Sequence, residues 1–231
     1  MPAPSPCRNH RSRPAGPLPR IGLAAVSLHA WVVAGGESPE PALLEELAPP
    51  QLIVAADSGA DVALGLGLKV DVVVGDFDSV TPAGAAAAPE QRRFPTDKDA
   101  TDLALALAEA RDRGAESLSV VGGSGGRLDH LLANVAVLAG DELASVRVDA
   151  LMGSARLWVV RRRATIRGSV GGLVTLLAHG GPAAGVRTTG LRWALAGETL
   201  AAGSSRGVSN VFAAPEATVT LESGVILAIR P

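Results

Sequence analysis

Short apolar runs that end in glycine or aspartate constrain the fold of this chain more than any other feature of its sequence. The runs cover residues 30–34, 52–56, 70–74, 117–121 and 146–151. Stretches with helical spacing or helix-start signals separate them, at residues 41–47, 60–66, 99–113 and 128–138. Short buried strands that alternate with helices are typical of a parallel sheet covered on both faces. Because ligands bind at the carboxyl edge of such a sheet, we expect the turns after these strands to carry the function.

The sequence changes character after about residue 152. Short strand-like runs follow, separated by glycine, serine and proline, with no long helical stripe: residues 157–160, 164–166, 173–177, 186–189, 217–221 and 225–229. This pattern is typical of a small β-sandwich or barrel. We therefore predict an α/β protein with an N-terminal parallel-sheet domain, residues 29–152, followed by a small all-β sandwich domain, residues 153–231. The Ala- and Pro-rich segment 81–90 is predicted to be a surface loop.

Residues 1–28 are predicted to be a disordered extension, or the product of a start codon placed too early. The first 20 residues contain six prolines and four arginines, which excludes a helix there. The apolar run at residues 21–33 is too short for a membrane-spanning helix, which needs about 20 residues. A basic stretch before an apolar one also admits a signal peptide, but no convincing cleavage site follows. We expect a cytoplasmic protein with no membrane partner.

Composition narrows the classes of partner. The net charge is −2, with the acids concentrated in the middle of the chain and the bases near its ends. An acidic segment that handles anions needs metal cations. The chain has no Tyr and only three Trp and three Phe, so a stacking surface for single-stranded nucleic acid is poorly supplied, and we expect no nucleic-acid partner. The single cysteine, Cys7, excludes an intrachain disulfide and a cysteine-based zinc site.

Two acidic clusters follow the predicted sheet. In Gly75-Asp76-Phe77-Asp78-Ser79, an extended backbone would point Asp76 and Asp78 the same way. Converging carboxylates are costly without a cation, and Mg²⁺ takes oxygen ligands beside phosphate oxygens. The alternative is an Asp-rich turn, for which Gly75 supplies the bend.

The second cluster is Asp97-Lys98-Asp99-Ala100-Thr101-Asp102. Asp99 can be the N-cap of the following helix, with Asp102 three residues later. That interpretation does not explain Lys98 between acids. A metal site completed by one of these aspartates, with Lys98 on a phosphate, accounts for the whole cluster.

Two further turns follow predicted strands. The glycine-rich stretch 122–126 precedes a predicted helix, and backbone N–H groups at a helix start attract phosphate. The planar, positively charged guanidinium group of Arg127 follows directly. The stretch matches neither the P-loop nor the dinucleotide fingerprint. Asp129 and His130 can also be ordinary residues of the helix start. In the turn that begins at Asp57, this carboxylate can bind a ribose hydroxyl or a metal-bound water, or it can cap a helix.

Taken together, these motifs resemble the thiamine pyrophosphokinase family. The matching stretches, in order, are Ala56-Asp57-Ser58-Gly59-Ala60, Gly75-Asp76-Phe77-Asp78-Ser79, Lys98-Asp99-x-Thr101-Asp102, Gly122-x-x-Gly125-Gly126-Arg127-Leu128-Asp129-His130, Gly190-Leu191-Arg192-Trp193 and Gly207-Val208-Ser209-Asn210. The resemblance runs from about Trp31 to Ile229. It implies a nucleotide-binding α/β domain followed by a β-sandwich, with Mg²⁺ and ATP, and a homodimer that holds thiamine near the subunit interface. The implied reaction transfers the pyrophosphoryl group of ATP to the thiamine hydroxyl, giving thiamine diphosphate and AMP.

The resemblance also implies a role for each matched residue. The metal ligands would be Asp76, Asp78 and Asp102. These three aspartates, together with Lys98 and Asp99, would form the catalytic group. The ATP site would comprise Asp57, Ser58, Gly59, Gly125, Gly126, Arg127, Asp129 and His130. Thiamine would contact Trp193, Ser209 and Asn210. From chemistry alone, Trp193 can instead pack in the sandwich core, and Ser209-Asn210 can simply turn the chain.

Two other functional classes stay open. One is a different Mg²⁺-dependent phosphotransferase or phosphohydrolase, which would share the acidic clusters and make no use of Trp193. The other is a regulator that binds thiamine or nucleotide and releases no AMP. His29, His179 and the run Arg161-Arg162-Arg163 are predicted to be surface or loop residues.

Overall fold

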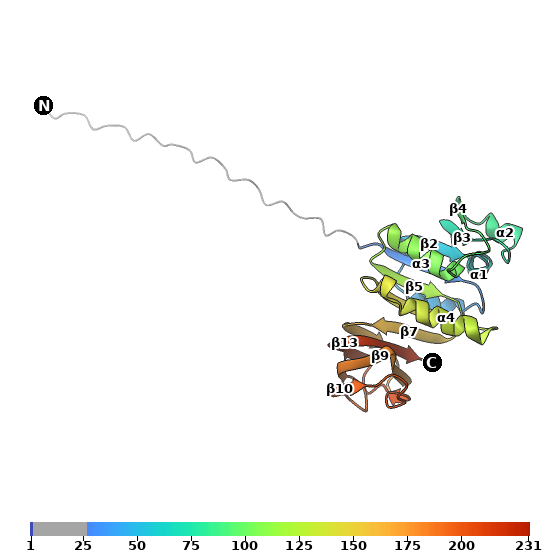
Figure 1. Ribbon diagram of the computed structural model, residues 1–231. Coiled ribbons are helices and arrows are strands. Elements are labelled where there is room, and N and C mark those ends of the chain that lie inside the picture. Colours follow the sequence, from blue (N-terminus) through green and yellow to red (C-terminus); the bar gives the residue numbers. More distant parts are fainter. Residues whose placement is uncertain (2–26) are drawn as a thin grey trace.

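The computed structural model describes residue 1 and residues 27–231, and most of the predicted N-terminal extension lies outside the described residues (Figure 1). Six strands form a parallel sheet in the order β4-β3-β2-β1-β5-β6. They are β1 (His29–Ala34), β2 (Leu52–Ala56), β3 (Val72–Gly75), β4 (Glu90–Arg93), β5 (Ser117–Val121) and β6 (Arg147–Met152). The predicted parallel sheet is therefore confirmed.

Helices cover both faces of this sheet because successive side chains of a strand point to opposite faces. Val32 and Val54 pack beneath α3 (Asp102–Asp112) and α4 (Leu128–Leu138). Val33 and Ala55 face α1 (Gly59–Gly65) and η1 (Pro41–Glu46) on the other side. Two shorter helical segments, α2 (Pro82–Ala85) and η2 (Asp141–Leu143), connect these elements. Two-sided burial explains why the strands are almost wholly apolar.

The second half of the chain is all β. Its strands are β7 (Ala155–Val160), β8 (Arg163–Arg167), β9 (Leu173–Thr189), β10 (Ala196–Leu200), β11 (Asn210–Val211), β12 (Glu216–Thr220) and β13 (Ser223–Arg230). Residues such as Ile166, Leu176 and Phe212 form a core distinct from that of the parallel sheet. The long strand β9 pairs with β13 along its first part and with β12 and β10 along its last part, so it passes from one sheet to the next.

The sheet does not stop at the predicted domain boundary. β6 and β7 pair antiparallel across it, and Met152 opposes Ala155 at the connecting turn. β7 then pairs with β13, so the parallel and antiparallel strands form one large mixed sheet (Figure 1). A division into two domains near residue 152 stays a prediction.

Several local predictions were wrong. The segment 81–90 contains α2, which Thr81 caps by accepting a hydrogen bond from the backbone N–H of Gly84 at 3.1 Å. His29 is buried, and its Nδ1 lies 2.9 Å from the Ser117 hydroxyl. Arg161 is half-buried and donates hydrogen bonds to the carbonyls of Ala139 and Gly140 at the end of α4. Within residues 27–231, every helix is too short or too polar to cross a membrane.

Candidate active site

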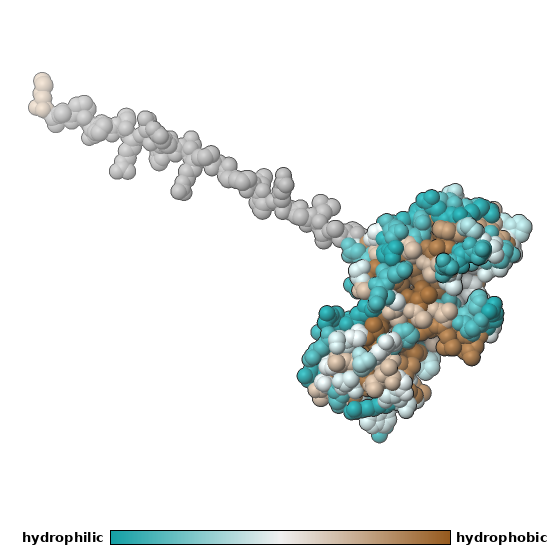
Figure 2. Space-filling view, in the orientation of Figure 1, coloured by the Kyte–Doolittle hydropathy of each residue, from teal (hydrophilic) through white to brown (hydrophobic). Residues whose placement is uncertain are grey.

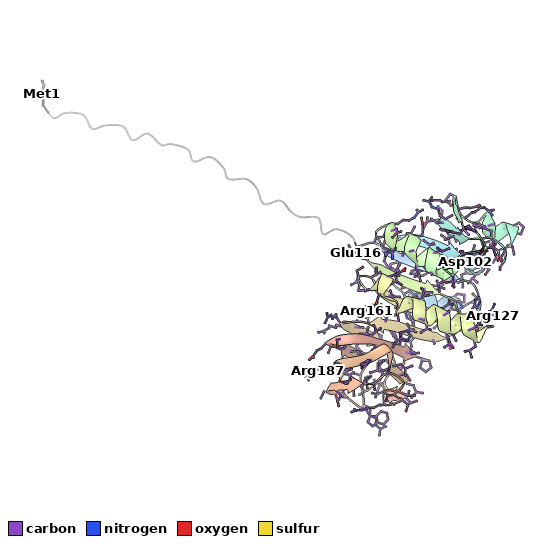
Figure 3. The ribbon with its side chains drawn as sticks, in the orientation of Figure 1. Met1, Asp102, Glu116, Arg127, Arg161 and Arg187 are labelled. Carbon is purple, nitrogen blue, oxygen red and sulfur yellow. The ribbon has the colours of Figure 1, made fainter. Side chains whose placement is uncertain are left out.

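A cavity of about 480 Å³ lies at the carboxyl edge of the parallel strands. Loops that follow β1, β2 and β5 line it, together with the start of α3 and one face of α4. In the sheet order, β1 lies between β2 and β5. The connection after β1 runs to β2 and the connection after β5 runs to β6, in opposite directions, which opens a crevice where ligands bind in open α/β sheets. Asp102 and Arg127 mark two sides of this region in Figure 3.

Two glycine loops pack against each other at the floor of the crevice. The backbone N–H of Glu37 donates to the carbonyl of Ser124 at 2.7 Å. Gly36 has φ +107, and a Cβ there would lie 2.3 Å from that same carbonyl oxygen. Asn134 of α4 holds the second loop by donating to the carbonyl of Gly123 at 2.9 Å. Gly35 and Gly36 were not among the predicted site residues. A Gly-Gly pair directly after a buried strand could have indicated that they belong to the site.

Three carboxylates gather beside this crevice. Asp57, Asp76 and Asp78 each offer an oxygen within 4.8 Å of the others. Asp57 is only 6% exposed, and its Oδ1 has no hydrogen-bond partner within the described part of the chain. An orphaned carboxylate oxygen beside two other acids fits a divalent cation. Burial raises the pKa of Asp57, and the charges of Asp102, Asp78 and Asp76 raise it further.

The backbone that aims these carboxylates is strained. Asp57 has φ +44 and Phe77, between Asp76 and Asp78, has φ +66. Left-handed conformations of non-glycine residues cost of order 1–3 kcal/mol and cluster at functional sites. The prediction of an extended Asp-x-Asp segment was therefore wrong, because a left-handed turn at Phe77 sets the directions of the two side chains.

Lys98 connects the two acidic clusters. Its Nζ donates a hydrogen bond to Asp76 Oδ2 at 2.7 Å and lies 3.1 Å from Asp102 Oδ1. The Lys98 and Asp76 side chains are 14% and 8% exposed, so water screens this pair weakly. The hydrogen bond from Lys98 lowers the pKa of Asp76. Burial opposes the charge of Lys98, but Asp76 and Asp102 raise its pKa overall, so the lysine stays cationic.

The start of α3 differs from the prediction. Thr101 is the N-cap, and its hydroxyl accepts from the backbone N–H of Ala104 at 3.2 Å. Asp102 is therefore the first residue of the helix, where a negative charge is favourable. Asp99 is exposed and lines a separate cavity between α3 and α4 instead of the crevice. The alternative that Asp99 caps the helix is therefore wrong.

The predicted phosphate-binding residues separate into two groups. Ser58, Gly125, Arg127 and His130 line the crevice. Gly59 does not line it: a Cβ there would lie 2.1 Å from the carbonyl oxygen of Val33, so this glycine allows close packing of α1 on β1. Asp129 lies outside the lining as well and pairs with Arg127 through contacts of 2.5 and 3.2 Å. Gly126 has φ +65 and shapes the loop without lining the cavity.

The three residues predicted to contact thiamine line a different cavity. Trp193, Ser209 and Asn210 surround a space of about 520 Å³ in the antiparallel half. Trp193 is 56% exposed, so the alternative that it packs in the core is wrong. Ser209 has φ +59, and Asp57, Phe77 and Ser209 are the non-glycine residues with positive φ in the described part of the chain. All three lie in predicted site motifs.

Asn210 holds the Trp193 loop in place. Its Oδ1 accepts from the backbone N–H of Trp193 at 3.1 Å, and its Nδ2 donates to the carbonyl of Trp193 at 2.8 Å. The same Oδ1 also accepts from the backbone N–H of Val211 at 2.8 Å. Asn210 is 6% exposed and its polar atoms are occupied by backbone. The geometry gives Asn210 a positioning role toward Trp193.

A crevice at the switch point of a parallel sheet, with carboxylates, a lysine and a glycine loop, defines a nucleotide-binding α/β protein that handles phosphate. Comparison with known families narrows this class. The family profile described as "Thiamin pyrophosphokinase, catalytic domain" matches residues 44–148, and "Thiamin pyrophosphokinase, vitamin B1 binding domain" matches residues 163–226. The chain belongs to the thiamine pyrophosphokinase family. The reaction of this family is transfer of the pyrophosphoryl group of ATP to thiamine.

Individual relatives agree with the family profiles. Thiamine pyrophosphokinase 1 of Oryza sativa subsp. japonica is 27% identical over 202 residues, which cover 78% of this chain and 72% of that protein. Thiamine pyrophosphokinase of Bacillus subtilis is 35% identical over 91 residues, 38% of this chain and 42% of that protein. The crystal structure of thiamine pyrophosphokinase from Bacillus subtilis has a TM-score of 0.75 at 23% identity, covering 87% of this chain and 98% of that one. A thiamin pyrophosphokinase family protein from Enterococcus faecalis gives 0.72 at 25% identity, covering 88% and 98%.

Proposed function

We propose that this chain carries out the family reaction in the crevice beside Asp57, Asp76 and Asp78, with thiamine supplied from the Trp193 cavity. One observation carries the proposal: separate turns of the parallel sheet bring three carboxylates, Lys98 and a glycine loop to one edge. Pyrophosphoryl transfer needs charge neutralisation and alignment more than covalent help from the protein. The site supplies groups for both tasks.

The acids would hold Mg²⁺. Asp57, Asp76 and Asp78 form the compact set, and Asp102 lies outside it. The Oδ1 atoms of Asp57 and Asp102 are both buried without a hydrogen-bond partner in the described part of the chain, so the proximity of the three carboxylates decides between them. We therefore revise the metal ligands from Asp76, Asp78 and Asp102 to a set in which Asp57 replaces Asp102. Asp102 serves instead to hold Lys98, whose Nζ lies 3.1 Å away. Mg²⁺ held by these carboxylates would supply positive charge that offsets the charge of the phosphates.

The nucleotide phosphates would lie between Lys98 and the glycine loop. Lys98 stays protonated because two carboxylates surround it, and it can then donate to a phosphate oxygen. Backbone N–H groups at the start of α4 and the Arg127 guanidinium face the same cavity. Arg127 is 71% exposed and paired only with exposed Asp129, so it can turn toward a ligand at small cost.

Thiamine would stack on Trp193, because an exposed indole offers a face to a cationic aromatic ring. No lining residue is shared by the Trp193 cavity and the crevice. In the sheet order, four inter-strand steps separate β5 from β9, which corresponds to roughly 19 Å at about 4.8 Å per step. One chain therefore keeps its two half-sites apart.

A homodimer would bring these half-sites together. α4 borders the crevice and exposes apolar side chains on its outer face: Leu128 is 67% and Leu132 is 61% exposed. Figure 2 shows hydrophobic residues gathered on this side of the molecule. An exposed apolar patch of this kind marks a protein contact, and we propose a second copy of the chain as the partner. A cytoplasmic location and the lack of a nucleic-acid partner stay predictions.

Product analysis tests the proposed reaction. Purified protein is incubated with ATP, Mg²⁺ and thiamine, and the products are separated by chromatography. We expect thiamine diphosphate with an equal amount of AMP, lost on addition of EDTA and in Asp76→Asn. Asp112→Asn, which removes an exposed acid at the end of α3, is the matched control and should keep full turnover. ADP with thiamine monophosphate, or thiamine binding without any product, would contradict the proposal.

A further inference from the structure

A second large cavity lies away from the crevice and shares no residue with it. It has a volume of about 840 Å³ and lies over β6, β7 and β13, between η1 and β8. This volume is in the range of small-molecule sites. We call it the arginine groove, because Arg147, Arg156, Arg167 and Arg230 all line it. The family reaction as described above makes no use of it.

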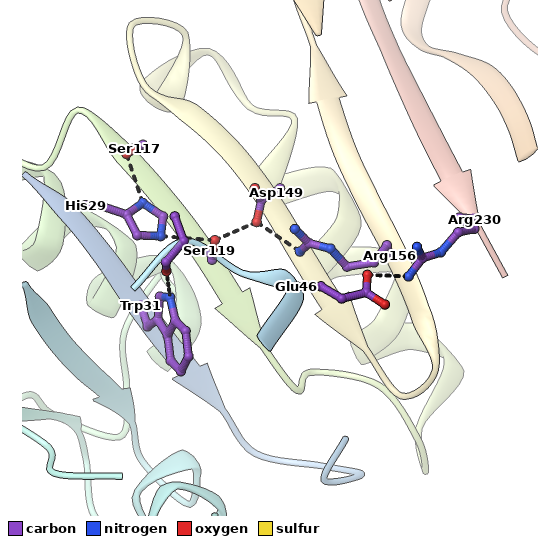
Figure 4. A network of polar contacts seen from close by, with 9 residues as sticks. His29, Trp31, Glu46, Ser117, Ser119, Asp149, Arg156 and Arg230 are labelled. Atoms are coloured by element: carbon purple, nitrogen blue, oxygen red, sulfur yellow. Dashed lines mark hydrogen bonds and ion pairs between the residues drawn. The ribbon is translucent and has the colours of Figure 1, made fainter. Parts of the chain in front are cut away.

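The fold brings these arginines together at a cost. Arg156 of β7 and Arg230 of β13 are register partners on adjacent antiparallel strands. Like charges directly opposite one another destabilise a sheet. Arg230 is held by Glu46 of η1 at 2.5 Å, and Arg156 by Asp149 of β6 at 3.1 Å (Figure 4). Each of these two arginines therefore depends on a carboxylate partner to offset the repulsion.

Two of the four arginines in the groove have weak or no charge compensation. The lining also contains Glu45 and Glu46, while Asp149 and Glu216 pair with Arg156 and Arg167 from outside the lining. Arg147 is exposed and stands outside the ion pairs found among residues 27–231. Arg167 pairs with Glu216 at 2.8 Å, but both side chains are more than half exposed, so this pair is weak.

The surroundings of the Arg156 side chain independently favour an anion as the ligand of the groove. Its side chain is 5% exposed, and only one of its terminal nitrogens donates to Asp149. Its Nε is buried without a hydrogen-bond partner in the described part of the chain. A buried charged donor without an acceptor is costly, and an anion drawn into the groove would supply one. Residues 2–26 contain no Asp or Glu, so the sequence before β1 offers no carboxylate for this purpose.

We propose that the arginine groove binds a phosphorylated small molecule, with its phosphate between Arg147, Arg156 and Arg167. Guanidinium groups bind phosphate through paired N–H donors, and the hydroxyls of Thr165 and Ser169 add donors on the β8 side. Trp158, with the Arg156 guanidinium 5.2 Å from its ring centre, offers an aromatic surface to the rest of the ligand. The volume leaves room for an organic group attached to the phosphate.

Calorimetric titration of the full chain with inorganic phosphate tests the site. The titration is done in EDTA, without thiamine or ATP, and at ionic strength held constant with sodium chloride. We expect one bound phosphate per chain. The double variant Arg147→Gln and Arg167→Gln should bind at least about tenfold more weakly, since it loses charge-assisted hydrogen bonds. Both residues are exposed, so the variant should fold, which circular dichroism and a thermal melt check.

Matched controls separate the groove from general charge and from the crevice. Lys69→Gln with Arg187→Gln removes the same charge at exposed positions elsewhere and should leave phosphate binding unchanged. Arg156→Lys keeps a cation beside Asp149 but loses the Nε–H, and it should also bind phosphate more weakly. Absence of binding, equal loss in the control variant, or loss in Arg127→Gln with retention in the groove variant would overturn the proposal.

A second series identifies the source of the phosphate. Wild type and the groove variant are titrated with AMP and with thiamine diphosphate, again without Mg²⁺. Binding of either product that is stronger than that of inorganic phosphate, and lost in the groove variant, assigns the groove to that product. Binding of inorganic phosphate alone assigns it to free phosphate. Turnover in phosphate-free buffer should be the same in wild type and the groove variant, so failure of this proposal would leave the proposed reaction untouched.

Discussion

Asp57 lies in surroundings that are unfavourable to its own charge. It is almost fully buried, its Oδ1 has no partner among the described residues, and three other carboxylates contribute to raising its pKa after burial itself. The folded protein therefore binds a proton at Asp57 more readily than the unfolded chain does. Its stability contribution falls as pH rises through the interval between the unfolded and the folded pKa. A bound cation would reverse this penalty.

Asp57→Asn is accordingly expected to stabilise the metal-free protein and to abolish turnover. At about pH 7 in EDTA, the variant should melt above wild type, with each kcal/mol worth roughly 2–4 °C in a chain of this size. The difference should shrink as acid protonates Asp57, because the penalty exists only for the charged form. Thermal melts across pH measure this directly. A wild type that is more stable than Asp57→Asn at neutral pH without metal would show that the charge of Asp57 is already compensated.

Trp193 is the residue on which thiamine recognition depends in our proposal. Its exposed ring contributes little to the core, so Trp193→Ala should leave the melting temperature nearly unchanged. Loss of a cation–π contact of about 0.5–2 kcal/mol should raise KM for thiamine by roughly 2- to 30-fold, with KM for ATP unchanged. Trp193→Phe should recover part of the loss. Steady-state kinetics with each substrate varied separately test this, and an unchanged thiamine KM in Trp193→Ala would remove the indole from the site.

At the scale of elements, apolar runs predicted the buried strands and helices well. Residues 52–56, 117–121 and 128–138 coincide with β2, β5 and α4. Buried elements have a strong hydrophobic signal, whereas β4 reads Glu-Gln-Arg-Arg and lies at the edge of the sheet with no such pattern. β9 was predicted as two strands because Gly180, Gly181 and Pro182 suggest a turn. In the structure these residues lie where one strand passes between two sheets.

The sequence motifs predicted which residues lie near the site, but they did not predict how the side chains of these residues are arranged. The turns at Asp57, Asp76 and Gly122 predicted the edge of the sheet at which the crevice lies, since each follows a buried strand. The proposed replacement of Asp102 by Asp57 as a metal ligand depends on the left-handed turns at Asp57 and Phe77, which propensities do not reveal. The capping role of Thr101 was hidden because Asp99 is an equally good cap by composition.

The capping of α3 provides a prediction for this element. Thr101→Ala removes the hydroxyl that accepts from the N–H of Ala104, which should cost about 1 kcal/mol of unfolding free energy. Because Asp102 follows directly and orders Lys98, turnover should also fall. Thr101→Ser keeps the cap and should restore both properties. Denaturant unfolding and turnover of the two variants check this, and full stability in Thr101→Ala would show that water replaces the cap.

At the scale of the whole molecule, the mixed sheet separates the two proposed half-sites. Strands β6, β7 and β13 lie between β5, which leads into the glycine loop, and β9, which borders the Trp193 cavity. Because these strands are joined by continuous backbone pairing, their order sets the separation of the two proposed half-sites. Domain closure within one chain is therefore a poor way to bring ATP and thiamine together, and contact between two copies is a better one.

Mixing two defective variants tests this arrangement. Asp76→Asn damages the ATP half-site and should be nearly inactive alone, whereas Trp193→Ala damages the thiamine half-site and should turn over roughly 2- to 30-fold more slowly at low thiamine. If each complete site combines halves from two subunits, a mixed dimer contains one site with both intact halves. Random exchange of equal amounts then makes half of the dimers mixed and should return roughly a quarter of wild-type turnover. If each site lay within one chain, every site would carry one defect and mixing would give only the mean of the two variants.

Replacing Leu132 of α4 with glutamate in both variants should prevent the recovery, because the exposed apolar face of α4 would no longer bury against a second copy.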